Sequence, residues 1–284
     1  MASTKSMAVI GAGAMGRGIA QVFAQSGFDV GLFDSAPAAL ESASAHIEKM
    51  LTRAVEKGRM TPDDASATKK RLTPVTSLSD LGLRSLVIEA ATENPDVKVE
   101  ILRSAQSLLT DDGILATNTS SISITRLAAV TDHPDRFIGM HFFNPVPVMK
   151  LVEVVRGLQT SEETVQRTVA LAKAVGKTPV SCNDHPGFVA NRVLMPMINE
   201  AIFVLQEGVA PAEAIDEIMK LGMNHPMGPL ALADLIGLDV CLDIMTVLHR
   251  DLGEDKYRPC PLLRKQVQAG RLGRKSGRGF HGYE

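Results

Sequence analysis

The chain has 284 residues, of which 45 % are hydrophobic and 22 % are charged, and its formal net charge is −2. This is the composition of an ordinary globular protein, and the length favours two domains over one. A nearly neutral chain with 9 Phe, 2 Tyr and no Trp lacks both the basic surplus and the stacking surface of a nucleic-acid binder. We therefore expect no nucleic-acid partner.

Cysteine usage and hydropathy favour a cytoplasmic protein. The three cysteines, Cys182, Cys241 and Cys260, form no C-x-x-C pair, which indicates neither a zinc site nor a disulfide framework, and we expect no bound metal. Scattered thiols fit a reducing compartment. The first strand is expected to begin by Met7, which leaves no room for a signal peptide. No apolar run reaches the roughly 18 residues that cross a membrane.

A glycine-rich loop follows the first predicted strand. The strand covers residues 7–10, and the loop reads Gly11-Ala12-Gly13-Ala14-Met15-Gly16 before an apolar helix face begins. In such a loop Gly11 permits a tight turn, Gly13 lets the backbone approach a pyrophosphate, and Gly16 lets the helix pack closely on the strand. The helix N-terminus then offers unpaired N–H groups to phosphates. The spacing predicts a dinucleotide site.

Asp34 ends the second predicted strand, residues 29–33. A carboxylate at this distance from the glycine loop can bind the ribose hydroxyls, and it repels a 2′-phosphate. The position therefore favours NAD over NADP. The alternative is a structural one, in which Asp34 caps the helix that starts near Ala36.

A pair of helices is predicted next, over residues 37–58 and from Pro62 to about Arg71. The pair is long for a plain crossover between strands, so we expect a helical arm that extends outward. It ends in the basic run Lys69-Lys70-Arg71. The run is either a solvated face or a contact for a phosphate-rich ligand tail.

Strands and helices then alternate, at residues 85–89, 97–110, 114–117 and 122–129. Glu93 and Ser120 follow the two strands, at the edge where doubly wound sheets bind their ligands. Each also has a structural alternative: Glu93 as a charge at a helix N-terminus, and Ser120 as an N-cap. The alternation predicts an α/β fold, a Rossmann-type doubly wound sheet.

His141 and Glu153 stand in apolar strands that follow one another. These predicted strands cover residues 137–142 and 150–155. A charged group buried alone is costly, so each side chain is the natural partner of the other. A hairpin centred near Val146 places His141 opposite Leu151 and Glu153 opposite Gly139, with the two charged groups as diagonal neighbours. A His oriented by a carboxylate is a general base; the alternative is a structural pair.

After Asp184 the pattern changes to helices alone. We predict domains at residues 1–184 and 185–284, the second all-helical and serving the substrate pocket and dimerisation. The predicted helices are residues 189–207, 211–221, 230–252 and 261–269.

These motifs resemble the 3-hydroxyacyl-CoA dehydrogenase family over essentially the whole chain, and within it the short bacterial members that act on 3-hydroxybutyryl-CoA. The segments that carry the resemblance are V-I-G-A-G-A-M-G at 9–16, E-A-A-T-E-N at 89–94, N-T-S-S at 118–121, H-F-F-N-P-V-P-V-M-K-L-V-E-V-V at 141–155 and D-H-P-G-F-V-A-N at 184–191. The chain departs from the family at Ala14, where many members carry a polar residue.

The resemblance implies roles for individual residues. His141 is the base, Glu153 is its partner, Ser120 hydrogen-bonds the substrate oxygen, and Asn191 is a further polar catalytic residue. The implied NAD contacts are Gly11, Gly13, Ala14, Met15, Gly16, Asp34, Glu93, Lys98, Ser120, Asn144 and Lys275. The resemblance also favours a homodimer.

The implied reaction is the reversible, NAD-dependent oxidation of an (S)-3-hydroxyacyl-CoA to the 3-ketoacyl-CoA, with an acyl-CoA as the substrate. Two alternatives stay open. One is a dehydrogenase of a free hydroxy acid or sugar acid on the same fold, and the other is a non-catalytic nucleotide-binding relative.

Overall fold

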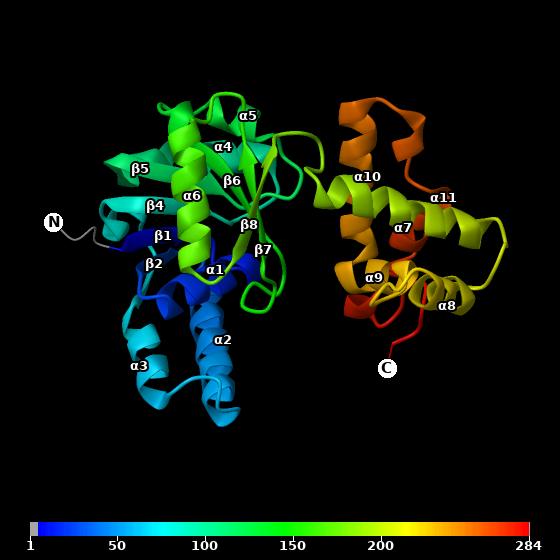
Figure 1. Ribbon diagram of the computed structural model, residues 1–284, viewed down its shortest axis with the longest axis horizontal. Helices are drawn as coiled ribbons and strands as arrows, with labels where there is room; N and C mark the ends of the chain where they lie inside the picture. Colours follow the sequence, from blue (N-terminus) through cyan, green and yellow to red (C-terminus); the bar gives the residue numbers. More distant parts are fainter. Residues whose placement is uncertain (1–4, 284) are drawn as a thin grey trace. The chain divides into compact units, whose positions relative to one another are not determined.

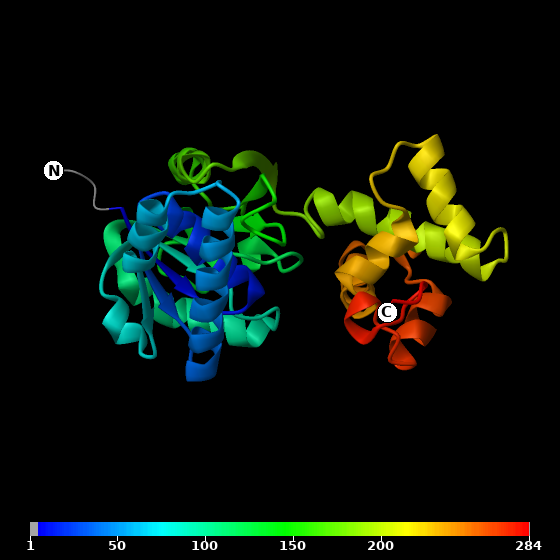
Figure 2. The ribbon, with the colours of Figure 1, turned by 90° about the horizontal axis from the view of Figure 1, so that it is seen from below.

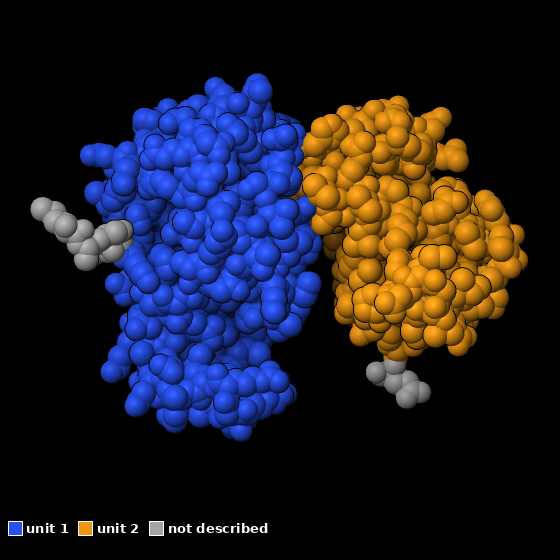
Figure 3. Space-filling view, in the orientation of Figure 1, with its two compact units in different colours: residues 1–184 blue, residues 185–284 orange. Residues whose placement is uncertain are grey.

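The computed structural model describes residues 5–283. The chain divides into an N-terminal unit that ends at Asp184 and a C-terminal unit that begins at His185, and Figure 3 gives each its own colour. All of the named strands belong to the N-terminal unit.

An eight-stranded sheet forms the centre of the N-terminal unit. Its strands are β1 (Ser6–Ile10), β2 (Asp29–Phe33), β3 (Leu72–Val75), β4 (Arg84–Glu89), β5 (Leu109–Thr117), β6 (Phe137–Phe142), β7 (Leu151–Arg156) and β8 (Thr178–Asn183). They lie in the order β3-β2-β1-β4-β5-β6-β7-β8. Neighbours are parallel except β6 and β7, which form an antiparallel hairpin. The carboxyl ends of β1, β2, β4, β5 and β6 therefore share one edge.

Helices cover both faces of this sheet (Figures 1 and 2). They are α1 (Ala14–Gln25), α2 (Pro37–Glu56), α3 (Pro62–Lys70), α4 (Pro95–Ala105), α5 (Ile124–Ala128) and α6 (Glu162–Ala174). Side chains of α1 and α6 share one buried cluster with the sheet, while α4 and α5 lie on the opposite face. The predicted α/β class, a Rossmann-type sheet followed by an all-α domain, is confirmed.

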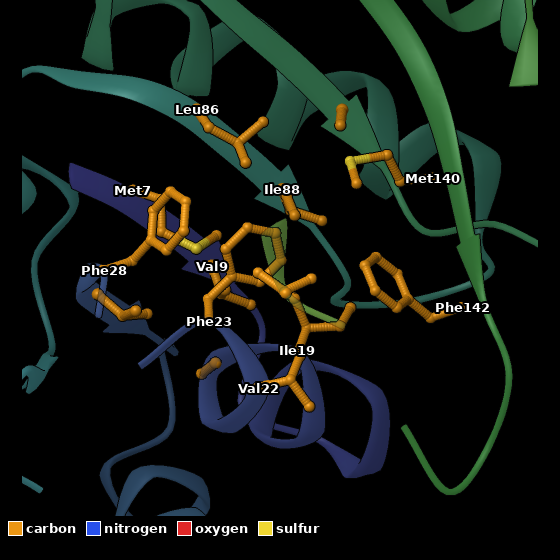
Figure 4. Packing of buried hydrophobic residues seen from close by; sticks show 14 of the residues in the cluster. Met7, Val9, Ile19, Val22, Phe23, Phe28, Leu86, Ile88, Met140 and Phe142 are labelled. Carbon is orange, nitrogen blue, oxygen red and sulfur yellow. The ribbon is translucent and has the colours of Figure 1, made fainter. Parts of the chain in front are cut away.

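The core between α1 and the sheet comes from the spacing of apolar residues in α1. Ile19, Val22 and Phe23 fall on one face of the helix and are 6 % exposed or less. Figure 4 shows them against Val9 and Ile88 of the sheet. Burying a side chain of this size contributes about 1.5–3 kcal/mol, so the contact fixes α1, and with it the preceding glycine loop, to the strands.

The α2 and α3 helices pack against each other and project from the sheet (Figure 1). Their contact is a small cluster of Ile47, Leu51 and Ala65. Thr61 caps α3, because its hydroxyl accepts a hydrogen bond from the Asp64 N–H at 3.1 Å.

The C-terminal unit consists of helices α7 (Ala190–Gln206), α8 (Ala212–Gly222), α9 (Pro229–Ile236), α10 (Leu238–Leu252) and α11 (Pro261–Gln268) around their own core. The prediction of one helix over residues 230–252 is wrong. Gly237 has a φ of +105° and divides α9 from α10, a conformation that glycine adopts at little cost. Within residues 5–283, no helix is both long and apolar enough to span a membrane.

Candidate functional site

The loop between β1 and α1 has the shape of a phosphate cradle. Gly11 has a φ of +106°, and a Cβ at Gly16 would lie 1.8 Å from the Gly11 carbonyl oxygen. A Cβ at Gly13 would meet no described atom within 4 Å, and no side chain within the described residues caps α1 at Gly13. The exposed Ala14 and half-buried Met15 begin α1. The start of α1 is therefore uncovered at Gly13, and a helix N-terminus of this kind can bind an anion.

Asp34 lies beside this loop at the end of β2. Its Oδ2 accepts a hydrogen bond from Ala12 N–H at 2.8 Å, and its Oδ1 accepts one from Ala36 N–H at 2.9 Å. The second contact lies just before α2, but Asp34 does not cap that helix as the structural alternative proposed, because the N-cap residue is Ala36 and no described side chain makes a cap hydrogen bond there. The carboxylate nevertheless stands at the loop, and its oxygens have further acceptor capacity.

A buried ion pair that the sequence had not revealed lies at the end of β4. Glu89 Oε2 is 2.6 Å from Lys98 Nζ and accepts a hydrogen bond from Thr117 Oγ1, also at 2.6 Å. Glu89 Oε1 accepts from Ala91 N–H. Both side chains of the pair are 0 % exposed. Losing either partner would leave a buried charge, so the pair fixes α4 against β4 and β5.

Glu93 joins this pair to the loop after β5. Its Oε1 accepts hydrogen bonds from Ser120 N–H at 2.7 Å and Ser120 Oγ at 2.9 Å, and Thr119 Oγ1 donates to its Oε2 at 2.9 Å. Lys98 Nζ lies 3.7 Å from the same carboxylate. The structure thus brings together three of the predicted residues: Glu93, Lys98 and Ser120.

The structural alternative for Ser120 is wrong, whereas Glu93 does stand just before the N-terminus of α4 without capping it. The side chain of Asn94, rather than that of Glu93, accepts hydrogen bonds from the first N–H groups of α4. Ser123, rather than Ser120, caps α5 by accepting from Arg126 N–H at 3.2 Å.

His141 and Glu153 form a buried hydrogen-bonded pair. His141 Nδ1 lies 2.7 Å from Glu153 Oε2, with side chains 10 % and 5 % exposed. The predicted register is wrong by two residues, because His141 pairs directly with Glu153 and Gly139 pairs with Val155. The predicted register was wrong because eight residues, 143–150, join the two strands, so the centre of the hairpin lies further along the chain than Val146.

Three further residues that the sequence had not revealed surround the pair. Asn118 Oδ1 accepts a hydrogen bond from Phe142 N–H at 2.9 Å, which ties β6 to the loop of Ser120. The ring of Phe143 lies 4.6 Å from that of His141, centroid to centroid. Burial, Glu153 and Asp184 raise the pKa of Cys182 to about 11, so this thiol stays protonated at neutral pH.

The loop of residues 143–150 carries Asn144 and is held in place by hydrogen bonds from Lys177. The Lys177 ammonium donates to the Val146 carbonyl and, at 2.8 Å, to the Met149 carbonyl. Burial lowers the pKa of Lys177. Val146 packs on α1, where a Cβ at Gly18 would lie 2.9 Å from its Cβ. The loop after β6 is therefore anchored to the helix of the glycine loop, with Asn144 exposed.

The last two predicted residues, Asn191 and Lys275, belong to the C-terminal unit. Asn191 is 8 % exposed in the first turn of α7. Lys275 Nζ pairs with Asp239 Oδ2 at 2.6 Å, so a ligand of Lys275 would have to share the ammonium with this carboxylate. Within the described part of the chain, no three His, Cys, Asp or Glu side chains are grouped to hold a metal ion.

Family models match both units. The model described as 3-hydroxyacyl-CoA dehydrogenase, NAD binding domain, matches residues 6–185, and that of the C-terminal domain of the same family matches residues 187–283. A probable 3-hydroxybutyryl-CoA dehydrogenase of Bacillus subtilis is 57 % identical over 280 residues, which are 99 % of this chain and 98 % of that protein.

Solved structures agree. The (S)-3-hydroxybutyryl-CoA dehydrogenase PaaH1 of Ralstonia eutropha superimposes with a TM-score of 0.96 at 52 % identity, covering 99 % of this chain and 100 % of that one. A diketoreductase that acts on dicarbonyl compounds is more distant, with a TM-score of 0.86 at 28 % identity over the full length of both chains.

Proposed function

Because the chain belongs to the 3-hydroxyacyl-CoA dehydrogenase family and is an NAD-dependent oxidoreductase, we propose that it interconverts (S)-3-hydroxybutyryl-CoA and acetoacetyl-CoA, with His141 as general acid and base. One observation supports this above all others. The buried His141–Glu153 pair stands at the end of β6, on the sheet edge that also carries the glycine loop, where ligands of doubly wound sheets bind.

The pair defines which nitrogen of His141 reacts. Its Nδ1 lies at hydrogen-bond distance from the Glu153 carboxylate, so the neutral ring carries its hydrogen on Nδ1 and presents Nε2 as the acceptor. In oxidation Nε2 takes the proton of the substrate 3-hydroxyl. Glu153 then stabilises the imidazolium through the same contact. In reduction the imidazolium returns that proton to the ketone oxygen.

Ser120 and Asn191 orient the substrate oxygen in this proposal. In the structure the Ser120 hydroxyl contacts Glu93, and rotation of the hydroxyl redirects its hydrogen toward a ligand. After that rotation the Glu93 carboxylate still accepts the hydrogen bond from the Ser120 N–H. Hydrogen bonds fixed in advance in this way stabilise charge as it shifts between hydroxyl and ketone.

The nucleotide-binding residues fit NAD. The open space at Gly13 and the uncapped start of α1 suit the pyrophosphate, Asp34 suits the adenosine ribose, and Glu93, Asn144 and Lys275 are the further proposed contacts. Lys98, whose side chain is 0 % exposed in its ion pair with Glu89, is proposed to act through Glu93 rather than by touching NAD. When bound, the nicotinamide accepts or donates the hydride at C3 of the substrate. The protein supplies position and the proton.

Replacement of His141 by Gln tests the proposal. His141→Gln should fold and bind NADH, yet lose about 10²–10⁴-fold in kcat, because positioned proton transfer typically contributes that much. The assay is the reduction of acetoacetyl-CoA by NADH, with NADH binding followed separately by fluorescence. His133→Gln, at an exposed histidine before β6, is the matched control. Near-normal turnover by His141→Gln would refute the assignment.

Two other functions are separated by simple assays. The similarity to a diketoreductase keeps open a substrate without coenzyme A. Activity on free 3-hydroxybutyrate but not on its thioester would favour a dehydrogenase of free hydroxy acids. Tight NADH binding without turnover across a ladder of 3-ketoacyl-CoA lengths would favour a non-catalytic relative.

We also propose that the enzyme acts in the cytoplasm as a homodimer. The C-terminal unit exposes apolar side chains on α8, which supports assembly.

A further inference from the structure

The imidazole of His141 is held on two sides. Glu153 contacts its edge at Nδ1, 2.7 Å away. Phe143 lies beside it in a tilted arrangement, with the two ring centroids 4.6 Å apart and the planes at 44°. His141 is 8 % exposed and Phe143 is half-buried, so little water reaches the imidazole. Two contacts in different directions leave the imidazole little freedom to rotate.

The Phe143 contact distinguishes the two protonation states of the base. The face of a phenyl ring carries partial negative charge, and a cation within about 6 Å of the centroid is attracted to it. The neutral imidazole gains only the weaker attraction between aromatic rings. The contact is therefore stronger once His141 has accepted a proton.

We propose that Phe143 is a positioning residue for the base, which holds the imidazole in line with Glu153 and stabilises the imidazolium formed during oxidation. This inference rests on the proposed function of His141. It adds an aromatic contact to the hydrogen bond between the imidazole and Glu153.

The other titratable groups near the pair do not replace this effect. Glu153, on β7, is hydrogen-bonded to the ring. On β8, burial raises the pKa of Cys182 to about 11, with smaller contributions from Glu153 and Asp184, and its thiol remains neutral at neutral pH. Asp184 itself is hydrogen-bonded to Ser123 Oγ and Thr125 N–H, at 2.7 and 2.8 Å. Phe143 adds an uncharged aromatic contact to these polar groups.

The sign of the expected pH effect follows from this preference. Loss of the phenyl ring removes stabilisation from the imidazolium, so the base loses its proton at lower pH. In oxidation, which needs the neutral ring, the acidic limb of kcat/KM moves to lower pH. In reduction, which needs the imidazolium, activity at neutral and alkaline pH falls. A cation–aromatic contact of ordinary strength corresponds to about 0.4–1.5 pH units.

The experiment compares Phe143→Leu with Phe143→Tyr, which keeps the ring, and with Phe142→Leu. Phe142 is the neighbouring aromatic residue, 2 % exposed in the core, and its replacement should lower the melting temperature but leave the pH profile unchanged. Phe143→Leu should move the acidic limb of oxidation and the alkaline limb of reduction to lower pH by about half a pH unit or more. It should also lower kcat for reduction and keep KM for NADH within about twofold. Phe143→Tyr should behave as wild type.

A double variant separates this inference from the proposed function. If Phe143 acts through His141, Phe143→Leu should have no further effect in the His141→Gln background. An unshifted profile in Phe143→Leu, or an equal loss of kcat in both backgrounds, would overturn the role of Phe143 while leaving the base intact. Full activity of His141→Gln alone would instead overturn the proposed function. Should Phe143→Leu fail to fold, a shifted profile in Phe143→Tyr would also contradict the inference.

Discussion

Asp34 is the residue whose charge should decide between the two nicotinamide cofactors. Its carboxylate contacts Ala12 N–H at the glycine loop, so a 2′-phosphate on the ribose would approach a negative charge there. Repulsion at such a half-exposed site is worth about 1–2 kcal/mol, or about tenfold in kcat/KM. Asp34→Ser should therefore lower the ratio of kcat/KM for NADH over NADPH by about tenfold.

The matched control for Asp34 is Asp29→Ser. Asp29 is exposed at the opposite end of the same strand, and its replacement should leave the cofactor ratio as it is. An unchanged ratio in Asp34→Ser would assign Asp34 to the support of α2 alone, through its contact with Ala36 N–H.

Buried charges were predictable from the sequence only where both partners lay on neighbouring strands. His141 and Glu153 interrupt two consecutive apolar runs, and the structure pairs them. Glu89 also ends an apolar strand, yet its partner Lys98 lies on a helix, and no pattern connects the two positions. Contacts between residues of different elements, such as that of Glu93 with Ser120, could not be predicted from the sequence pattern.

At the scale of elements, the central strands were predictable and the edge strands were not. The predicted ends of β2 and β6 agree with the structure. The sequence did not reveal β3 and β8, the two edges of the sheet. β3 contains Pro74 and β8 contains Pro179. Both strands also have exposed positions, which weaken the run of apolar residues that predicts a strand. Proline is tolerated at sheet edges because fewer ladder hydrogen bonds are required there.

The loop of residues 143–150 should depend on Lys177. Lys177→Met leaves the Val146 and Met149 carbonyls without their ammonium donor, which costs about 1–3 kcal/mol. Hydrogen exchange should therefore speed up about fivefold or more at the amides of Val148 and Met149, which donate to the Pro145 carbonyl. KM for NADH should rise if Asn144 contacts the cofactor. Lys173→Met, at an exposed lysine of α6, is the control. Equal exchange rates in both variants would contradict the stabilisation of the loop by Lys177.

The same variant carries a pH signature. Burial lowers the pKa of Lys177, so the folded protein releases this proton at lower pH than the unfolded chain does. Between the folded value and the unfolded value of about 10.4, the unfolded state binds more protons, and stability rises with pH. The free energy of unfolding of wild type relative to Lys177→Met should therefore increase through that alkaline window, as urea titrations can measure.

At the scale of the whole molecule, the α8 helix carries apolar side chains on two sides. Ala212 and Ile215 are buried within the C-terminal unit, whereas Ile218 and Leu221 are 60 % and 78 % exposed. A helix that is apolar beyond its packed face usually has a further partner. The proposed homodimer supplies one, in the form of α8 from a second copy of the chain.

Sedimentation of wild type should therefore give twice the mass of one chain at micromolar concentration. The double variant Ile218→Glu with Leu221→Lys should shift this equilibrium to the monomer, because charges placed in an apolar interface lose their hydration without gaining a partner. Leu158→Glu makes a similar change at a leucine of the N-terminal unit that is 85 % exposed, and it should stay dimeric. A monomeric wild type would contradict the homodimer, and a dimeric double variant would contradict the assignment of α8 as its contact surface.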